Sequence, residues 1–456
     1  MRTLWNVSVL SFTRGETTMC SIKSAIPWPN GKAYLFEGTQ YLRYDFHNGT
    51  QDQIPQPIIP MWPGLRPNAP DAAVYWGFGK VYFFYGDEFI RFDISDNAVE
   101  SYYLPPNPPR KIADYWPGLW SDGIDAAVNW GNGKIYFFRG SEYLRYDISL
   151  ERVDPGYPIS INSAWSGIWP DKIDAVLYQG GEKAYFFKDN EYRRFDLATN
   201  NVDQSGQVSA LTLDPVPPGM WTPSRDLTLN QANLVMGYLI QNGKFSLSST
   251  QTPYTGDWLT SINSPQPANR VVVKPPNING VDFIHEAGPA PVIDNLDQRM
   301  LICLYRLTRW VNASEPEVAV IRHMGIGHGS GPPTDCHNQG RALDFSGLEG
   351  SSFGVNFIRK VLRDWGNKPV IAGNSMRLDS VADPLAHDLF RAVFRFATFE
   401  CECNGIGTGN KWPPKEIGDV GGFVIHPDYI DHPPPNQQLR PQHQNHIHMQ
   451  IGPTNQ

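Results

Sequence analysis

The sequence predicts a multidomain protein in which an all-β propeller of four blades is followed by an α+β domain. Three observations indicate this fold class. Four related segments follow one another before residue 224, and the pattern of apolar residues changes after residue 295. Of the eleven histidines, only His47 lies before residue 280. We therefore expect nitrogen-ligand or acid–base chemistry in the C-terminal part of the chain.

The four segments share one strand pattern. Each alternates aromatic and polar residues, then turns at Gly or Asp-Asn into a second strand. Their lysines lie 48, 54 and 49 residues apart, which is the spacing of propeller blades. The segments read GKAYLFEGTQYLRYDF, GKVYFFYGDEFIRFDI, GKIYFFRGSEYLRYDI and EKAYFFKDNEYRRFDL, with the lysines Lys32, Lys80, Lys134 and Lys183.

A short strand of small residues begins nine positions before each of these lysines. Small side chains suit the crowded axis of a ring in which each blade packs against its neighbours. We expect the recurring aromatic residues Tyr34, Tyr82, Tyr136 and Tyr185 to pack in the core. The small-residue strands read KSAI at 23–26, DAAV at 71–74, DAAV at 125–128 and DAVL at 174–177. The closing turns, rich in Pro, Gly and Trp, end at Arg66, Trp120, Trp169 and Trp221.

These strand, aromatic and turn signals together resemble the hemopexin repeat over about residues 20–223. The resemblance implies a four-bladed propeller that binds a protein, haem, a polyamine or an ion, and it implies no catalysis. Two positions depart from the pattern. Lys23 stands where the other blades have Asp, so we expect no symmetric axial cation site. The fourth blade has no cysteine to match Cys20, so the ring-closing disulfide of many relatives is absent.

Bulk properties exclude some classes of function. The net charge of −8 argues against nucleic acid as the main partner. No apolar run approaches the length of about 18 residues that crosses a bilayer. Residues 1–19 are expected to form an N-terminal extension, whose short apolar stretch makes a poor signal peptide. The five cysteines do not suggest a disulfide framework, although one local bridge in the C-terminal half is possible.

The remaining chain divides into a linker region at 224–284, with one helix at 229–243, and a domain at 285–456. The Pro-, Asn- and Ser-rich stretch 262–280 reads as a second linker or an extended arm. In the last domain helices and strands mix without a regular βαβ order, which indicates an α+β fold. The expected elements are helices at 296–312, 351–366 and 387–405, and strands at 317–325 and 445–452.

The stretch TDCHNQGRALDFSG, at 334–347, places a histidine and an aspartate seven positions apart. His337 lies in a loop, and Asp344 begins or lies within a strand. The short connection Gly-Arg-Ala-Leu can bring both side chains onto one surface. Taken alone, this spacing is as well explained by a surface histidine beside a capped turn.

The closing stretch HQNHIH, at 443–448, makes a metal site the stronger hypothesis. His446 and His448 point the same way, because residues two apart on a strand share a face. Zinc needs about three converging protein ligands and an open position for water. His337, Asp344 and His448 would supply two neutral ligands and one anionic ligand. His446 would then lie beside the metal as a base or as a stabiliser of the transition state.

These two motifs resemble the zinc peptidases of the LAS type, which include lysostaphin-like, D-alanyl-D-alanine carboxypeptidase and hedgehog-like folds. Within that group, residues 285–453 look most like the extensin-like C-terminal domain. The resemblance implies that His337, Asp344 and His448 are zinc ligands and that His446 is a second catalytic histidine.

Four further residues bear on the expected site. Carboxypeptidase relatives carry a Glu where this chain has Asn445, which favours a histidine-based variant. Arg322 matches the place where relatives hold an anion-binding arginine, but an ordinary surface arginine is an equal alternative. Cys336 could be a fourth ligand, although we expect it to pack away from the site. His443 is the outer member of the H-x-x-H-x-H motif, without a clear role.

The sequence therefore predicts a zinc metallopeptidase-like hydrolase of peptide or amide bonds, directed to its target by the propeller. The family resemblance implies a cell-wall peptide as substrate, and it favours action outside the cell. The alternative is a binding protein without catalysis, in which the propeller binds a protein, haem or polyamine and the metal site is structural. The sequence does not identify the partner of the propeller.

Overall fold

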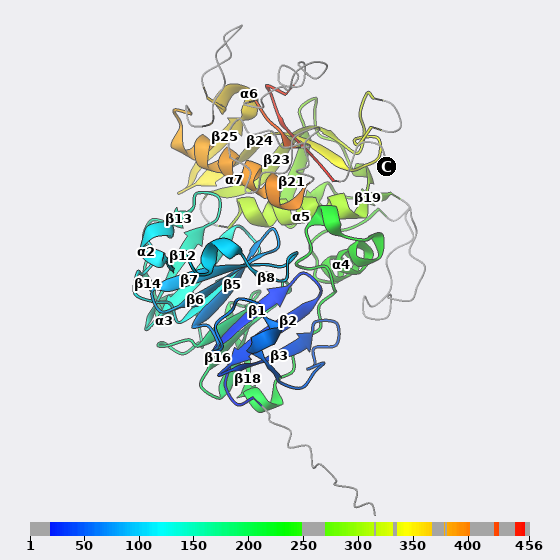
Figure 1. Ribbon diagram of the computed structural model, residues 1–456. Coiled ribbons are helices and arrows are strands. Elements are labelled where there is room, and N and C mark those ends of the chain that lie inside the picture. Colours follow the sequence, from blue (N-terminus) through cyan, green and yellow to red (C-terminus); the bar gives the residue numbers. More distant parts are fainter. Residues whose placement is uncertain are drawn as a thin grey trace, which may run out of the picture.

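The computed structural model describes residues 19–248, 270–313, 316–331, 335–366, 378, 381–401, 424–427 and 443–451. Four small sheets form one end of the molecule, and a larger sheet with helices forms the other (Figure 1). The extension expected at 1–19 lies outside the described residues except for Met19. In the part of the chain that the structure describes, no helix is long and apolar enough to cross a membrane.

Each of the four small sheets is antiparallel and starts with a short strand of small or apolar residues. These inner strands are β1 (Ser24–Trp28), β5 (Ala72–Gly77), β10 (Ala126–Asn129) and β15 (Ala175–Tyr178). The first sheet adds β2 (Lys32–Glu37), β3 (Gln40–Asp45) and β4 (Gln56–Pro57), and the second adds β6 (Lys80–Tyr85), β7 (Glu88–Asp93) and β8 (Ala98–Val99). The third adds β11 (Lys134–Arg139), β12 (Glu142–Asp147) and β13 (Arg152–Val153), and the fourth adds β16 (Lys183–Lys188), β17 (Glu191–Asp196) and β18 (Asn201–Gln207). Two further strands, β9 (Arg110–Lys111) and β14 (Ile159–Ser160), pair with β7 and β12.

The inner strands close into a ring. Strand β5 lies between β1 and β10, and β15 lies between β10 and β1. Ala25, Ala72 and Ala126 are almost fully buried on these strands, as the crowded axis of a ring requires. The prediction of an all-β propeller of four blades is therefore confirmed.

One tryptophan fills the space between neighbouring blades. Trp62 contacts Phe36 of the first blade and Phe83 of the second, with ring centroids 5.2 and 6.0 Å apart. Edge-on contacts of this kind stabilise a core beyond the area they bury. Tyr34, expected in the core, lies 5.1 Å from the same tryptophan. Trp62, Trp116 and Trp165 each follow a one-turn helix, α1 (Ile58–Met61), α2 (Ile112–Tyr115) and α3 (Ile161–Ala164).

An ion-pair network explains why a lysine recurs in every blade. In the third blade Lys134 lies 2.5 Å from Asp147 and 2.9 Å from Asp154, and Arg145 also contacts Asp154. Because the lysine is almost fully buried, these carboxylates stabilise its charge. The same arrangement joins Lys32, Asp45 and Asp52, then Lys80, Asp93 and Glu100, then Lys183, Asp196 and Asp203.

The start of the inner strands is asymmetric, as the sequence predicts. Asp125 and Asp174 each accept a hydrogen bond from a backbone N–H in a neighbouring turn at 2.7 Å. Asp71 does the same, and it also lies 3.5 Å from the ammonium of Lys23. In the first blade this position therefore carries a cation, Lys23, which is paired with one of the three carboxylates.

The larger sheet contains seven strands. Their order is β20 (Asn277–Ile278), β21 (Val281–His285), β23 (Glu317–Ile326), β24 (Ala342–Ser352), β27 (Ile447–Gln450) and β26 (Val424–Ile425), with β25 (Val355–Lys360) also paired to β24. Strands β21 and β23 run parallel, whereas β24 runs antiparallel to both β23 and β27. Two short strands, β19 (Val271–Val273) and β22 (Ile293–Leu296), pair separately. Part of the stretch expected as a linker at 262–280 therefore forms strands, while 262–269 lies outside the described residues.

Three long helices accompany this sheet. Helix α5 (Gln298–Val311) packs against α4 (Leu229–Gln241) and α7 (Pro384–Glu400). Helix α4 starts at a capping box formed by Thr228 and Gln231, which satisfies backbone N–H groups of its first turn. These helices match those expected at 229–243, 296–312 and 387–405, although α7 ends at Glu400 and residues 402–405 lie outside the described part. Short 3-10 turns occupy Ser101–Tyr103, Val208–Ala210 and Ser224–Asp226.

The prediction of a helix at 351–366 is wrong. These residues complete a hairpin of β24 and β25, followed by the single helical turn α6 (Val361–Asp364). Phe353 and Gly354 turn the chain with positive φ angles of 48° and 78°. Phe357 is buried while its neighbours on β25 are exposed, which is the alternation of a strand.

The two ends of the molecule are joined by many contacts. Arg306 of α5 is almost fully buried and donates to the carbonyls of Gly219, Met220 and Thr222 at 2.7–2.9 Å. It also lies 2.8 Å from the carboxylate of Glu400 at the end of α7. The propeller and the helices therefore share one buried polar network.

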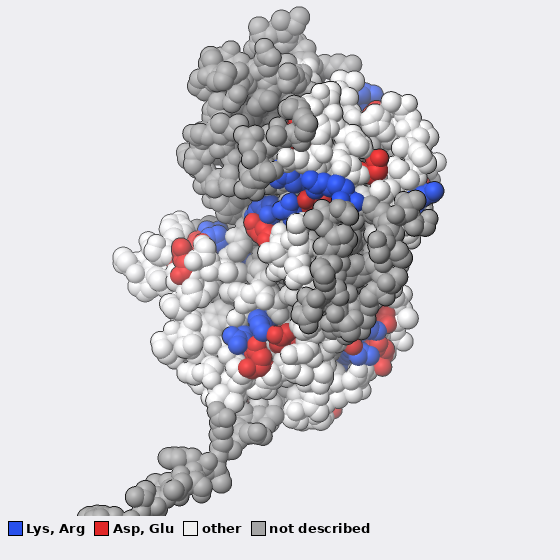
Figure 2. Space-filling view, turned by 90° about the vertical axis from the view of Figure 1, so that its right-hand side faces the viewer, with Lys and Arg blue, Asp and Glu red and all other residues white. Residues whose placement is uncertain are grey.

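Further contacts extend this interface to the inner strands. Arg309 donates to the Trp130 carbonyl at 2.8 Å, and the ring of Trp310 packs on Gly133. Phe399 packs in the same way on Gly77, with no room for a β-carbon at either glycine. On the face in Figure 2, basic and acidic side chains lie close together and most of the described surface is uncharged. The absence of a nucleic-acid partner stays a prediction.

Candidate metal centre

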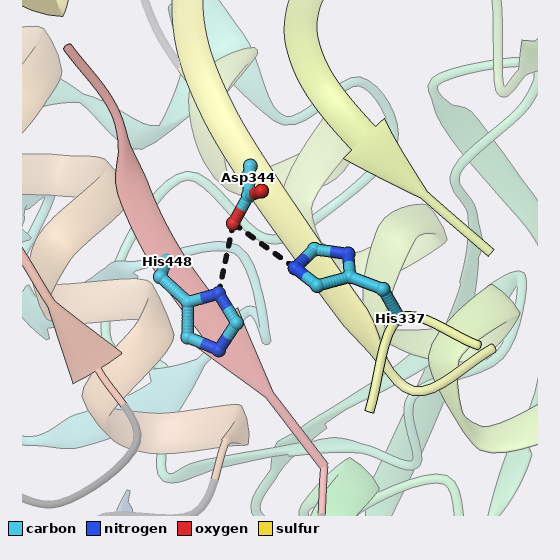
Figure 3. Close-up of side chains that lie close together, drawn as sticks. All are labelled: His337, Asp344 and His448. Atoms are coloured by element: carbon cyan, nitrogen blue, oxygen red, sulfur yellow. Dashed lines mark hydrogen bonds and ion pairs between the residues drawn. The ribbon is translucent and has the colours of Figure 1, made fainter. Parts of the chain in front are cut away.

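The candidate site lies where β24 and β27 pair. Asp344 near the start of β24 is directly opposite His448 on β27. His337 reaches the same place from the loop that precedes β24, so three segments supply one side chain each (Figure 3). One ligand atom from each residue lies within 4.8 Å of those from the other two. The structure thus brings together the three residues that the sequence predicts as metal ligands.

One carboxylate oxygen is the centre of the cluster. Asp344 Oδ1 lies 2.8 Å from His448 Nδ1 and 3.2 Å from His337 Nε2. His446 Nε2 lies 3.4 Å from the same oxygen. The other ring nitrogen of His337, Nδ1, is buried without a hydrogen-bond partner among the described residues. A buried polar atom of this kind normally has a partner, and a metal ion would supply one.

Backbone bonds hold the loop that carries His337. The carboxylate of Asp335 accepts the His337 N–H at 2.9 Å, and the Gly340 N–H donates to the His337 carbonyl at 2.9 Å. Gly340 has a φ of 68°, and a β-carbon there would lie 1.9 Å from the Asn295 carbonyl oxygen. Only glycine fits this close approach, so the turn fixes where His337 starts. Cys336 is buried and does not belong to the three-residue cluster.

A second glycine leaves space for the cluster on the neighbouring strand. Gly325 of β23 pairs with Asp344, and a β-carbon there would come within 3.3 Å of His337 Nδ1 and 3.4 Å of Asp344 Oδ2. A larger side chain at this position would project toward the ligands. The role of this glycine is not predictable from the sequence, because it depends on the pairing of β23 with β24.

The protonation of the cluster follows from burial and from the short contacts. Burial alone would raise the pKa of Asp344, but hydrogen bonds from His337 and His448 hold it well below the usual value. Burial opposes the charge of His448, yet its contact with Asp344 raises the pKa of this histidine. Asp344 therefore stays anionic, as a metal ligand must be.

His446 differs from the three ligands. Its pKa is lowered, first because of burial, so the neutral imidazole is favoured near pH 7. Its Nδ1 lies 2.7 Å from the side-chain oxygen of Asn445, which fixes the orientation of the ring. The ring of His443 lies 4.7 Å from that of His446, measured between centroids.

Arg322 is already paired with acidic residues. Its guanidinium contacts Glu349 on β24 and lies 3.9 Å from Glu286. Glu286 also accepts from Ser346 at 2.8 Å and lies 2.7 Å from Lys360. To hold a substrate carboxylate, Arg322 would have to exchange these partners.

One buried histidine close to the site, His323, was not predicted from the sequence. His323 is 8% exposed and its Nδ1 has no hydrogen-bond partner among the described residues. Burial and the neighbouring His285 lower the pKa of His323 to about 4, although the charges of Asp344 and Glu286 favour its protonation. Its position next to Arg322 was the available signal, but a lone histidine on a strand is usually a core residue.

The pattern of the Hemopexin family matches residues 70–121 and 124–170, which contain the second and third repeats. The chain therefore carries a hemopexin repeat domain. Among solved structures, it is similar to hemopexin fold protein CP4 from cow pea, at 20% identity and a TM-score of 0.36, covering 42% of this chain and 94% of that one. It is also similar to a plant lectin with two metal binding sites from Cicer arietinum, at 24% identity and a TM-score of 0.34, covering 38% of this chain and 86% of that one.

Proposed function

We propose that this chain is a metal-containing binding protein, in which the hemopexin repeat domain binds a partner and the C-terminal part holds one zinc ion. The convergence of His337, Asp344 and His448 from three segments supports the metal site most directly. The hemopexin match supports a binding role for the propeller better than it supports catalysis. This is the alternative function predicted from the sequence, a binding protein whose metal site is structural.

The donor set fits zinc. Two imidazoles and one carboxylate are ligands that zinc takes in tetrahedral sites, and one position stays open. Asp344 is anionic, so a divalent ion with neutral histidines keeps a net positive charge. No cysteine belongs to the cluster among the described residues, which argues against a soft thiolate site.

Metal analysis of the full chain tests this proposal. The wild-type protein should carry about one zinc per chain, and Asp344→Ala should lose most of it because the only anionic ligand is removed. Asp294→Ala is a matched control, since Asp294 contacts His328 at 2.9 Å but this pair is exposed and has no third ligand. Equal metal content in wild type and Asp344→Ala would contradict the proposed site.

Hydrolysis of a peptide or amide bond is the second candidate function, and His446 favours it. This buried histidine lies beside the ligand cluster, has a lowered pKa and is oriented by Asn445. A bound zinc ion would supply Lewis acidity and lower the pKa of water toward neutrality. His446 could then accept a proton at Nε2, while Asn445 holds its other nitrogen.

The substrate in this second case would be a cell-wall peptide or a related amide, as the sequence resemblance implies. Arg322 could anchor a carboxylate of that substrate only after leaving Glu349. Incubation of the zinc-loaded chain with such peptides, followed by mass spectrometry of the products, tests the hydrolase directly. If the peptides are intact after exhaustive incubation, the hydrolase function is contradicted and only the binding function remains.

A further inference from the structure

Two cysteines from distant parts of the chain meet in the core of the C-terminal part. Cys303 lies in the middle of α5, and Cys401 directly follows α7. Their sulfur atoms are 3.9 Å apart across 98 positions of sequence. The residues are 1% and 0% exposed. We propose that this pair is a disulfide site, at which oxidation forms a covalent bond between α5 and the end of α7.

The backbone around Cys401 is held in place on two sides. Its N–H donates to the Ala397 carbonyl at 2.9 Å, and its carbonyl accepts from Arg225 at 3.0 Å. A disulfide has a sulfur separation of about 2.0 Å. The two sulfur atoms therefore need to approach by about 1.9 Å for the bond to form.

Two of the other cysteines lie away from this pair. Cys20 is exposed at the start of the propeller, and Cys336 lies in the loop next to His337. Cys403 follows Cys401 by two positions and lies outside the described residues. Cys403 is thus the competing partner for Cys303. The experiment has to distinguish a bond from Cys303 to Cys401 from a bond from Cys303 to Cys403.

The oxidation balances with a small disulfide such as oxidised glutathione. The thiolate of one cysteine attacks the small disulfide, which forms a mixed disulfide and releases one small thiolate. The thiolate of the second cysteine then attacks the protein sulfur of that mixed disulfide, so the protein bond forms and a second small thiolate leaves. Two electrons pass to the small disulfide, and the two protons lost by the cysteines are taken up by the released thiolates.

Burial decides when this reaction can occur. Both thiols are closed off from solvent in the folded chain, so an external disulfide reaches them during folding or local opening. Once formed, the bond is protected from small thiols for the same reason. The pair is therefore expected to be a structural disulfide in an oxidising compartment and a pair of thiols in a reducing one.

The bond would stabilise the contact between the helices and the propeller. Glu400, next to Cys401, lies 2.8 Å from Arg306 and accepts a hydrogen bond from the Ser224 hydroxyl at 2.7 Å. Arg306 is three positions after Cys303 on α5. Closing a loop of 98 positions also restricts the unfolded chain, so we expect the oxidised form to melt several degrees higher.

Peptide mapping of the full chain tests the proposal. The protein is refolded with a mixture of reduced and oxidised glutathione, alkylated without reduction, digested and analysed by mass spectrometry. A cross-linked peptide pair that contains Cys303 and Cys401 is the expected result. Alkylated thiols at both positions, or a bond from Cys303 to Cys403, would overturn the proposal.

Thermal melting provides a second readout. The wild-type chain should melt several degrees higher after oxidation than after reduction, and Cys20→Ser should keep this difference. Cys303→Ser should abolish it, because the bond can no longer form. If the oxidised and reduced wild-type chains melt at the same temperature, the bond does not stabilise the structure as inferred.

Discussion

His448 Nδ1 lies 2.8 Å from Asp344 Oδ1, although 104 positions of sequence separate the two residues. The contact exists because β27 pairs with β24 in a register that places these residues opposite each other. A register shift of one residue would turn His448 to the other face of the sheet. The proposed metal site therefore depends on the correct folding of this sheet, and zinc binding should stabilise the folded chain.

Substitution of the two histidines of β27 should separate binding from chemistry. We expect His448→Ala to lower zinc affinity by more than about 100-fold, since even the loss of an outer partner of a ligand costs about 10–100-fold. His446→Ala should change the affinity by only a few-fold, because His446 is not a ligand in this account. Competition with a chromophoric chelator measures both. Similar losses in the two variants would contradict the assigned roles.

If the chain hydrolyses peptides, His446 should control the rate. His446→Ala should lower hydrolysis by about 10²–10⁴-fold, the usual effect of removing a positioned acid or base. Asn445→Ala frees Nδ1 of His446 and should reduce the rate by a smaller factor with zinc content unchanged. Rates are compared at equal zinc loading. If His446→Ala hydrolyses the peptides at the wild-type rate, another group must transfer the proton.

Arg306 should be the most sensitive residue of the interface between α5 and the propeller. Arg306→Ala removes one buried charged donor from the Glu400 carboxylate and from three backbone carbonyls. Breaking a buried pair in this way costs about 3–5 kcal/mol. Denaturant unfolding, followed by fluorescence, measures the change in the free energy of unfolding.

Arg152→Ala is the matched control for this interface. Arg152 lies in the propeller and forms an ion pair across the interface, 3.8 Å from Asp388 of α7. Its side chain is 54% exposed, whereas Arg306 is almost fully buried. An exposed pair contributes only about 0–1 kcal/mol. Equal effects of Arg306→Ala and Arg152→Ala would show that the buried network does not hold the two ends together.

Asp297 should make stability depend on pH. This buried residue caps α5 and contacts Arg299 and Arg270 at 2.9 and 3.0 Å. Burial alone would raise the pKa of Asp297, but the hydrogen bond from Arg299 outweighs it and the pKa lies below its usual value. A carboxyl whose pKa is depressed on folding stabilises the folded state at pH values above its unfolded pKa of about 3.9. This stabilisation is lost as the pH falls from there through the folded pKa.

Asp297→Asn isolates this contribution, since the amide keeps a capping oxygen but carries no charge. The variant should be less stable than wild type at pH 7 by about 2 kcal/mol, the scale of a hydrogen bond to a charged group. The difference between the two proteins should shrink as the pH falls below about 4. A difference that stays constant from pH 7 to pH 3 would contradict this assignment.

The sequence predicted much of the fold because its signals are local or repeated. Alternation of aromatic residues around Lys134 and its counterparts identified the blades, and the spacing of His337 and Asp344 together with the closing HQNHIH stretch predicted the three-residue cluster. The hairpin that contains Phe353 was missed because a short apolar run fits a helix and a strand equally well. The contacts of Arg306 and of Gly325 were missed because they depend on partners that are distant in sequence.

The position of a bound metal ion tests the central claim most directly. Crystals of the zinc-loaded full chain, measured at the zinc absorption edge, should show one anomalous peak in the C-terminal part. The account predicts this peak about 2.0–2.2 Å from one atom each of His337, Asp344 and His448, with His446 outside that distance. A zinc peak at another place, or no peak at these three residues in crystals soaked with zinc, would contradict the account.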